Sequence, residues 1–157
     1  MAEITRLLVL GGTGFIGHHL LCAAVEKNWS LSSLSLHPPK NERYVTGVEY
    51  LHGDLLVLNE VEDLLRDKEF EYVVNLGGYI KHTQFKQGGR QLIEEHFTAI
   101  QNLLTVLSRE RLQAFIQIGS SDEYGNAPAP QHEGMRESPI SPYSHGKVAT
   151  THFLQML

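Results

Sequence analysis

A glycine-rich turn near the start of the chain limits its fold more than any other feature. The turn, residues 11–17 (GGTGFIG), follows the apolar run Leu7–Leu10 directly and precedes apolar residues that recur at helical spacing. Its glycines fit both G-x-G-x-x-G and G-x-x-G-x-x-G. A continuous apolar run is typical of a strand that is buried on both faces of a parallel sheet. We therefore expect a strand–turn–helix unit at the start of such a sheet.

Strand and helix patterns alternate along the rest of the chain. Further strands are expected at 31–36, 48–52, 72–76 and 114–118, and helices at 16–25, 58–65, 93–107 and from about Tyr143 onward. Parallel strands need crossover connections, and right-handed crossovers place helices on both faces of the sheet. The predicted fold is α/β, with a Rossmann-type doubly wound parallel sheet.

The glycine turn indicates a dinucleotide site. One glycine permits the tight turn, one lets the backbone approach a pyrophosphate, and one lets the helix pack against the strand. The helix N-terminus offers free N–H donors to the phosphates. A turn with only a structural role is the alternative. We expect residues 1–157 to form one NAD(P)-binding Rossmann domain, in which the turn contacts the cofactor through Gly11, Thr13, Gly14, Phe15, Ile16 and Gly17.

The residues after the second predicted strand bear on the choice between NAD and NADP. An NAD enzyme usually carries an acid there to hold the ribose 2′-OH, but residues 34–38 (LSLHP) contain none. Ser35 can hydrogen-bond a phosphate, and His37, Lys40 and Arg43 could add positive charge. NADP is therefore modestly favoured over NAD. Lys40 and Arg43 could instead be solvated loop charges.

Asp54 and Leu55 follow the third predicted strand and are also expected at the cofactor. The Asp54 carboxylate could accept a hydrogen bond from the adenine amino group. It could equally be the N-cap of the next helix, and the two roles are compatible.

A tyrosine and a lysine four residues apart, Tyr143 and Lys147, would share one face of a helix. A neighbouring ammonium favours the phenolate, so the pair suits general acid/base chemistry on a hydroxyl or ketone. The segment 119–125 (GSSDEYG) follows the fifth predicted strand, and ligands of doubly wound sheets bind at the carboxyl ends of strands. We expect Ser120, Tyr143 and Lys147 to converge with the pyrophosphate site.

With these motifs in this order and at these spacings, the chain closely resembles the extended short-chain dehydrogenase/reductase family, the NAD-dependent epimerase/dehydratase group. The resemblance covers essentially the whole chain. It implies that Tyr143 is the catalytic acid/base and that Lys147 activates it and bonds the nicotinamide ribose. It also implies that Ser120 orients the sugar oxygen, with Ser121 as the substitute if the loop is shifted by one residue.

The resemblance implies an NAD(P)-dependent nucleotide-sugar epimerase or dehydratase that transfers a hydride at sugar C4. It also implies that Leu76, Gly77 and Gly78 form a backbone wall along the cofactor. Asp122 and Glu123 could assist the elimination of water, or they could only cap or salt-bridge their loop. The alternative activity is NADPH-dependent reduction of a 4-keto sugar nucleotide, and a non-catalytic dinucleotide-binding regulator or scaffold is the alternative of another class.

The chain departs from the family pattern in two further ways. His96 stands where the family usually has an asparagine near the start of the long middle helix, and a lone histidine there is more often a core or surface residue than a catalytic base. The chain also ends ten residues after Lys147, which suggests truncation before the substrate domain. Family members usually form homodimers through the middle helix and the Tyr143 helix.

Charge and composition exclude several partners. The net charge is −5 with no block of like charge, which argues against a nucleic-acid or anionic-membrane partner. No apolar run reaches the roughly 20 residues that span a bilayer. The single cysteine, Cys22, is read as a small core residue, and the nine histidines lack the spacing of metal ligands. We expect a cytoplasmic protein without a metal.

Overall fold

The computed structural model describes residues 4–157, which divide into two compact units. The first comprises the chain up to Gly77 together with Asn102–Ile118, and the second comprises Gly78–Gln101 together with Gly119–Leu157. The first contains the sheet, and the second is built mainly of helices and loops.

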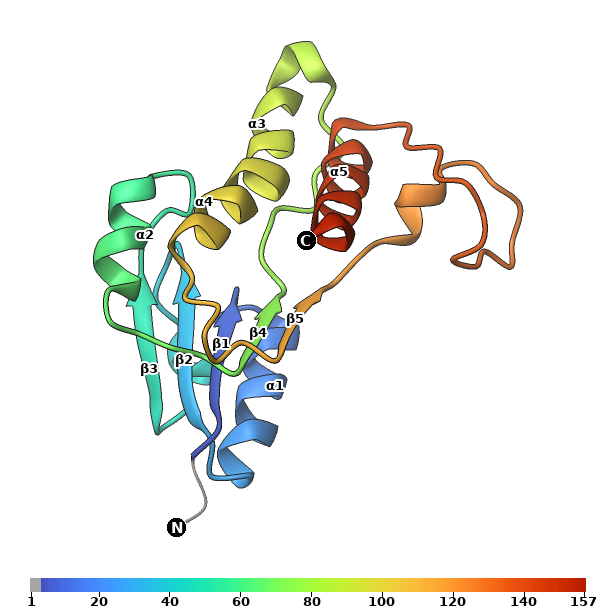
Figure 1. The fold of residues 1–157 in the computed structure, drawn as a ribbon. Coiled ribbons are helices and arrows are strands. Elements are labelled where there is room, and N and C mark those ends of the chain that lie inside the picture. Colours follow the sequence, from blue (N-terminus) through green and yellow to red (C-terminus); the bar gives the residue numbers. More distant parts are fainter. Residues whose placement is uncertain (1–3) are drawn as a thin grey trace. The chain divides into compact units, whose positions relative to one another are not determined.

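The first unit is organised around a five-stranded parallel sheet (Figure 1). Its strands are β1 (Arg6–Leu10), β2 (Ser30–Ser35), β3 (Val48–His52), β4 (Tyr72–Asn75) and β5 (Ala114–Gln117). They lie in the order β3-β2-β1-β4-β5, and each pairs in parallel with its neighbours. The first strand in sequence is therefore central, and the chain adds strands first on one side of it and then on the other.

The central strand is buried on both faces. Successive strand residues point to opposite faces, and Leu7 and Val9 pack in one cluster with Leu21 of helix α1 (Phe15–Glu26). Leu8 and Leu10, on the other face, are fully buried as well. Both faces of the sheet are thus covered in this unit, as a doubly wound arrangement requires.

The helices of the first unit begin and end as the sequence pattern indicates. Helix α1 is followed by Asn28, which has a φ of 56° and stops the helix in the left-handed region. Helix α2 (Leu58–Leu65) buries Val61 and Leu65. The asparagine side chain of Asn102 donates to the Leu55 carbonyl at 2.9 Å, which holds the loop after β3.

The second unit contains the long middle helix and the last helix. The middle helix runs as α3 (Gly89–Ile93), a π-helical turn (Glu94–Thr98) and α4 (Ala99–Val106), whose last residues belong to the first unit. Helix α5 (Pro142–Met156) begins at a reciprocal cap, because the Ser144 N–H donates to Ser141 Oγ and the Ser141 N–H donates to Ser144 Oγ. Proline at the first helical position supports this start.

The predicted Rossmann-type parallel sheet is confirmed, and the expected strands and helices are present with shifts of a few residues. The strands expected to end at Leu36, Leu76 and Ile118 end one residue earlier, and the middle helix begins at Gly89 rather than Ile93. Whether residues 1–157 act as one domain stays a prediction. In the part of the chain that the structure describes, no helix is long and apolar enough to span a membrane.

Candidate active site

The glycine turn of the first unit is closed by backbone contacts that exclude side chains. The Gly14 N–H donates to the Gly11 carbonyl at 3.0 Å, and Gly11 has a φ of 75°. A Cβ at Gly17 would lie 2.5 Å from both Gly11 O and the Cα of Gly12. Helix and turn therefore touch backbone to backbone, which only glycine permits.

The outer side of this turn fits a pyrophosphate. A Cβ at Gly14 would meet only the Gly11 carbonyl within 4 Å, so this position is otherwise open. Gly14 is the N-cap of α1, no side chain caps it, and the first turn carries no acid that would repel a phosphate. Phe15 and Ile16 are more than half exposed. These features leave the helix N-terminus available as an anion site.

The loop after β4 approaches the same turn. A Cβ at Gly11 would lie 3.0 Å from the Gly77 nitrogen, and the Leu76 N–H donates to the Leu10 carbonyl at 3.0 Å. The Gly77 N–H donates to the buried side chain of Asn75 at 3.0 Å. The structure thus brings Gly11, Leu76 and Gly77 together. Asn75, which the sequence pattern gave no reason to select, fixes the loop.

Ser35, the last residue of β2, offers a hydroxyl that the protein leaves unused. Its Oγ is buried and has no hydrogen-bond partner among the described residues, while its carbonyl accepts from the Gly53 N–H at 3.3 Å. Ser33 Oγ is likewise buried without a partner among the described residues, and it lies against Gly12 of the turn. Such hydroxyls are groups that a bound ribose or phosphate can satisfy. His37 and Lys40 are exposed in the loop that follows.

Asp54 does not cap helix α2, so that alternative is wrong. The N-cap is Val57, because Asp54 instead forms a tight turn in which its Oδ1 accepts from the Leu56 N–H at 2.9 Å. Its own N–H donates to the Glu60 carboxylate at 2.9 Å. The second carboxylate oxygen is not used in this turn, and the expected contact with adenine stays a prediction.

Tyr143 and Lys147 lie one helical turn apart on α5, as the spacing predicts, and both are buried in the second unit. The Lys147 Nζ lies 6.0 Å from the centre of the Tyr143 ring. Burial lowers the pKa of Lys147 below its ordinary value, and the Glu123 carboxylate opposes that shift. The helix therefore presents a phenol and an amine that share one partly desolvated environment.

The loop after β5 is folded by its own side chains. The Ser120 N–H donates to Glu123 Oε1 at 2.7 Å, and Ser120 Oγ accepts from the Asp122 N–H at 3.2 Å. Thr151 of α5 donates to Glu123 Oε2 at 3.1 Å. Glu123 thus has a capping role, one of the alternatives that its position left open. Ser120 is half-buried, whereas Ser121 is exposed.

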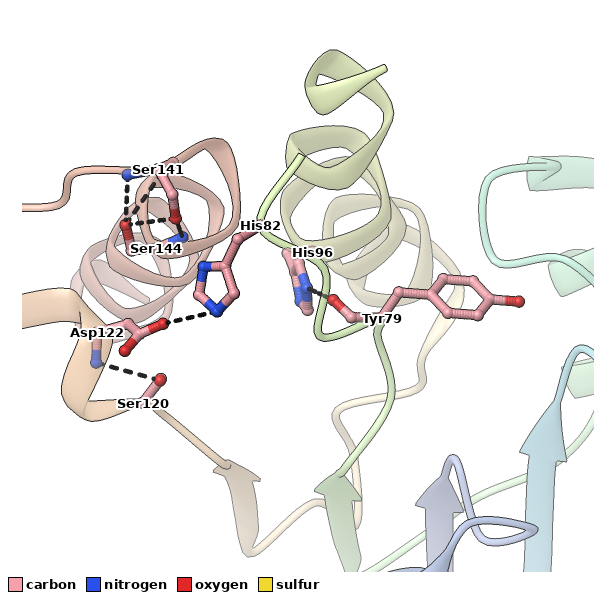
Figure 2. Close-up of polar contacts among 7 residues, drawn as sticks. All are labelled: Tyr79, His82, His96, Ser120, Asp122, Ser141 and Ser144. Carbon is pink, nitrogen blue, oxygen red and sulfur yellow. Dashed lines mark hydrogen bonds and ion pairs between the residues drawn. The ribbon is translucent and has the colours of Figure 1, made fainter. Parts of the chain in front are cut away.

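Asp122 faces a partner that the sequence pattern did not suggest. Its Oδ2 lies 3.5 Å from Nε2 of His82, and the two side chains point toward each other in Figure 2. The His82 ring also meets the Tyr143 ring edge to face, with centres 5.7 Å apart. The pair connects the Ser120 loop with the phenol of Tyr143. No spacing rule relates positions 82 and 122, so only the fold could reveal it.

A pocket of about 510 Å³ opens beside this pair within the second unit. Phe85, Ile140 and Pro142 contribute apolar surface, and His82 and Asp122 contribute polar groups. Pockets that bind small molecules commonly combine apolar walls with a few polar groups. Among residues 4–157, no group of three or more His, Cys, Asp or Glu side chains is placed to hold a metal.

His96 lies in the π-helical turn and is buried. Its Nε2 is 3.2 Å from the Tyr79 carbonyl (Figure 2). Burial lowers the pKa of His96 to about 4, the charge of Lys147 adds to this shift, and the Tyr79 carbonyl opposes it. His96 is therefore neutral at physiological pH. Of the two places expected for it, core or surface, the structure shows the core.

A parallel sheet with a glycine turn, and a buried tyrosine–lysine pair beside a serine loop, together define a short-chain dehydrogenase type of protein. The chain belongs to the NAD dependent epimerase/dehydratase family, which residues 7–157 match. This confirms the family that the motifs indicate.

Individual relatives are distant but cover the chain. A UDP-glucose 4-epimerase of Dictyostelium discoideum is 22% identical over 161 residues, which are 97% of this chain and 47% of that protein. A dTDP-D-glucose 4,6-dehydratase of the same organism is 21% identical over 174 residues, 97% of this chain and 40% of that protein. The chain thus spans about half the length of the curated relatives it matches.

Solved structures confirm the fold. The UDP-glucose 4-epimerase of Thermotoga maritima with UDP-glucose aligns with a TM-score of 0.86 at 22% identity, covering 97% of this chain and 50% of that one. The Thermus thermophilus UDP-glucose 4-epimerase in complex with NAD aligns with a TM-score of 0.78 at 26% identity, with the same coverage.

Proposed function

We propose that the whole protein is an NAD(P)-dependent nucleotide-sugar epimerase or dehydratase in which Tyr143 handles the proton at sugar O4. The observation that carries this proposal is the burial of Tyr143 and Lys147 on one face of α5. The Tyr143 ring meets the ring of His82, which lines the pocket. A merely superficial tyrosine–lysine pair would be solvated. Relatives of this chain include both UDP-glucose 4-epimerases and a dTDP-D-glucose 4,6-dehydratase, so the proposal covers both reactions.

Each residue of the candidate site has a part in this chemistry. The Tyr143 phenolate takes the O4 proton as the C4–H bond breaks, and Lys147 stabilises the phenolate by its charge. Ser120 can donate its hydroxyl proton to the sugar oxygen, because its Oγ accepts only from the Asp122 N–H in the described contacts. The nicotinamide cofactor, when bound, supplies the hydride acceptor.

We propose NAD or NADP as the cofactor and modestly favour NADP. The glycine turn offers backbone donors for a pyrophosphate, and the buried Ser35 hydroxyl has no hydrogen-bond partner among the described residues. No acid stands at the end of β2 to hold a 2′-hydroxyl. Calorimetric titration with NADPH and NADH side by side tests this choice. Tighter binding of NADH would reject the preference for NADP and leave the family assignment intact.

Asp122 and His82 favour a dehydration step as the second candidate reaction. A carboxylate and an imidazole that face one pocket can together remove and deliver protons, as the loss of water next to a 4-keto group requires. With Asp122→Asn we expect hydride transfer at C4 to continue while release of water from dTDP-D-glucose stops. Water loss at the wild-type rate would reject this role.

The central experiment follows UDP-glucose and dTDP-D-glucose by NMR and mass spectrometry with the whole protein. We expect a new C4 epimer or a product lighter by one water. Tyr143→Phe should lower the rate by about 10²–10⁴-fold, and the exposed Tyr44 provides the control Tyr44→Phe, which should not change it. Turnover that survives Tyr143→Phe would reject the acid/base role. Dinucleotide binding without conversion would favour the regulator alternative.

We further propose that the whole protein forms a homodimer through α5 and the middle helix, the arrangement that the family resemblance implies. Sedimentation of the whole protein tests it, and a monomer at micromolar concentration would reject it.

Cytoplasmic location stays a prediction, which microscopy of the tagged protein can check.

A further inference from the structure

His96 occupies the meeting point of three segments of the second unit. His96 lies in the π-helical turn Glu94–Thr98 and is only 3% exposed. The loop that begins at Gly78 passes over its ring, and α5 packs against its backbone. A π-helical turn inserts an extra residue into a helix and is frequently found at functional sites.

Contacts of its ring, its Cβ and its backbone hold His96 in place. The Nε2 hydrogen-bonds the Tyr79 carbonyl at 3.2 Å, and the backbone carbonyl of His96 accepts from Thr150 Oγ1 at 2.8 Å. A Cβ at Gly78 would come within 2.1 Å of the imidazole Cε1, so the ring fills the space beside this glycine. A Cβ at Gly146 would lie 3.1 Å from the His96 Cβ.

The hydrogen bond determines the tautomer. A carbonyl only accepts, so Nε2 must carry the proton, and the neutral ring leaves Nδ1 unprotonated. The charged or titratable groups that face the ring are Lys147 and Tyr143 of α5. A second positive charge beside Lys147 is unfavourable, which agrees with a neutral imidazole.

The imidazole presents its ring to the phenol. The centres of the His96 and Tyr143 rings are 5.1 Å apart, and their planes meet at 78°. Such edge-to-face pairs are favourable and directional. Because His96 is itself tethered, its ring provides a fixed surface against which the phenol settles, whereas His82 on the pocket side is 60% exposed.

We propose that His96 is a positioning residue for Tyr143: its Nε2–H tether to the Tyr79 carbonyl holds the imidazole where it sets the direction of the phenol. The inference rests on the proposed acid/base role of Tyr143. A residue that only fills the core could be replaced by any ring of similar size. A positioning residue needs both its ring and its tether.

Two variants separate these requirements. His96→Phe keeps a ring but cannot donate to Tyr79, and His96→Gln keeps a donor but has no ring. The matched control is His145→Gln, an exposed histidine on the same helix as Tyr143. Misplacement of a reacting group by about 1 Å can cost on the order of 10²-fold in rate. We therefore expect both His96 variants to lower kcat by about tenfold or more and to change KM by less than about twofold.

Two measurements decide the outcome. Long-range ¹H–¹⁵N NMR of the wild-type protein should show His96 as the neutral Nε2–H tautomer at pH 7, and this arm needs no substrate. Kinetics with UDP-glucose and dTDP-D-glucose should show the loss in kcat in both folded variants and none in His145→Gln.

An imidazolium or Nδ1–H form at pH 7 would overturn the inference. So would wild-type kcat in His96→Phe or His96→Gln while Tyr143→Phe is inactive, a result that leaves the proposed function standing. Full activity of Tyr143→Phe, or conversion of neither nucleotide-sugar, would count against the proposed function and the inference together.

Discussion

A buried carboxylate at the amino edge of the sheet offers a sharp test of what stabilises the first unit. Glu71, directly before β4, is 6% exposed and accepts from the Arg6 N–H at 2.7 Å and from Arg111 Nε at 2.9 Å. Its backbone carbonyl also accepts from the Gln113 N–H at 2.8 Å. One residue therefore joins the starts of β1, β4 and β5.

The cost of Glu71→Gln follows from these contacts. The amide keeps one acceptor oxygen, so one of the two hydrogen bonds is lost and an NH₂ group faces a donor. A hydrogen bond to a charged group contributes about 1.5–3 kcal/mol. Arg111 still has the Glu69 carboxylate 3.9 Å away, so we expect the loss of folding free energy to lie near the lower end of this range, at about 2 kcal/mol. For a chain of this size that lowers Tm by roughly 4–8 °C.

Thermal unfolding followed by circular dichroism measures the effect, and Glu69→Gln is the matched control. Glu69 reaches Arg6 and Arg111 only at 3.8 and 3.9 Å and is a third exposed, so its removal should cost less than about 1 kcal/mol. Equal shifts in the two variants, or a Tm change below about 1 °C for Glu71→Gln, would refute the reasoning.

The pH dependence of Glu71→Gln provides an independent check. Burial raises the pKa of Glu71, but the hydrogen bonds from Arg6 and Arg111 more than offset it and leave the pKa below its ordinary value. A carboxyl with a lowered pKa stabilises the folded state above its unfolded pKa, and this stability is lost as pH falls through the lowered value. The Tm gap between wild type and variant should be full at pH 7 and should shrink below about pH 4.

Three further substitutions test other contacts. Thr150→Val removes the buried hydroxyl that lies 2.8 Å from the His96 carbonyl and 2.9 Å from the Gly146 carbonyl. Because both carbonyls lose this partner, chemical denaturation should show the free energy of unfolding lowered by about 1–3 kcal/mol. Ser120→Ala removes the cap of its loop and should cost about 1 kcal/mol in the same assay, with a fall in turnover that Ser120→Thr restores. Gly17→Ala puts a Cβ 2.5 Å from Gly11 O, and calorimetry should show cofactor binding weakened by about tenfold or more.

The fold was predictable because local and long-range signals agree in the first unit. The run Leu7–Leu10 is apolar at every position, and the structure buries it on both faces at the centre of the sheet. The serine-rich segment that forms β2 gave a weak signal, since serine has no strong preference for strands. Its pairing with β1 and β3, rather than its composition, makes it a strand.

The candidate site was predictable only where its residues lie close together in the sequence. The spacing of Tyr143 and Lys147 fixes their shared face through helical geometry, and Ser120 follows a strand that the apolar pattern reveals. His82 and Asp122 are 40 positions apart and belong to loops, whose paths no periodicity encodes. The mistaken cap at Asp54 has a similar origin, because an aspartate before a helix can cap it or close a tight turn.

A glycine in a motif can be required for a reason other than the one that the motif suggests. Gly78 is expected from the family pattern to form a wall along the cofactor, yet in this chain its missing side chain makes room for the His96 imidazole, 2.1 Å from where a Cβ would lie. Its φ of 112° further restricts the position to glycine. Gly146 on α5 lies against the His96 side chain and against the backbone of Leu92 and Ile93 at the end of α3. The two glycines and the histidine therefore pack as one unit. An imidazole fits at position 96 only because Gly78, 18 positions before it, and Gly146, 50 positions after it, have no side chain.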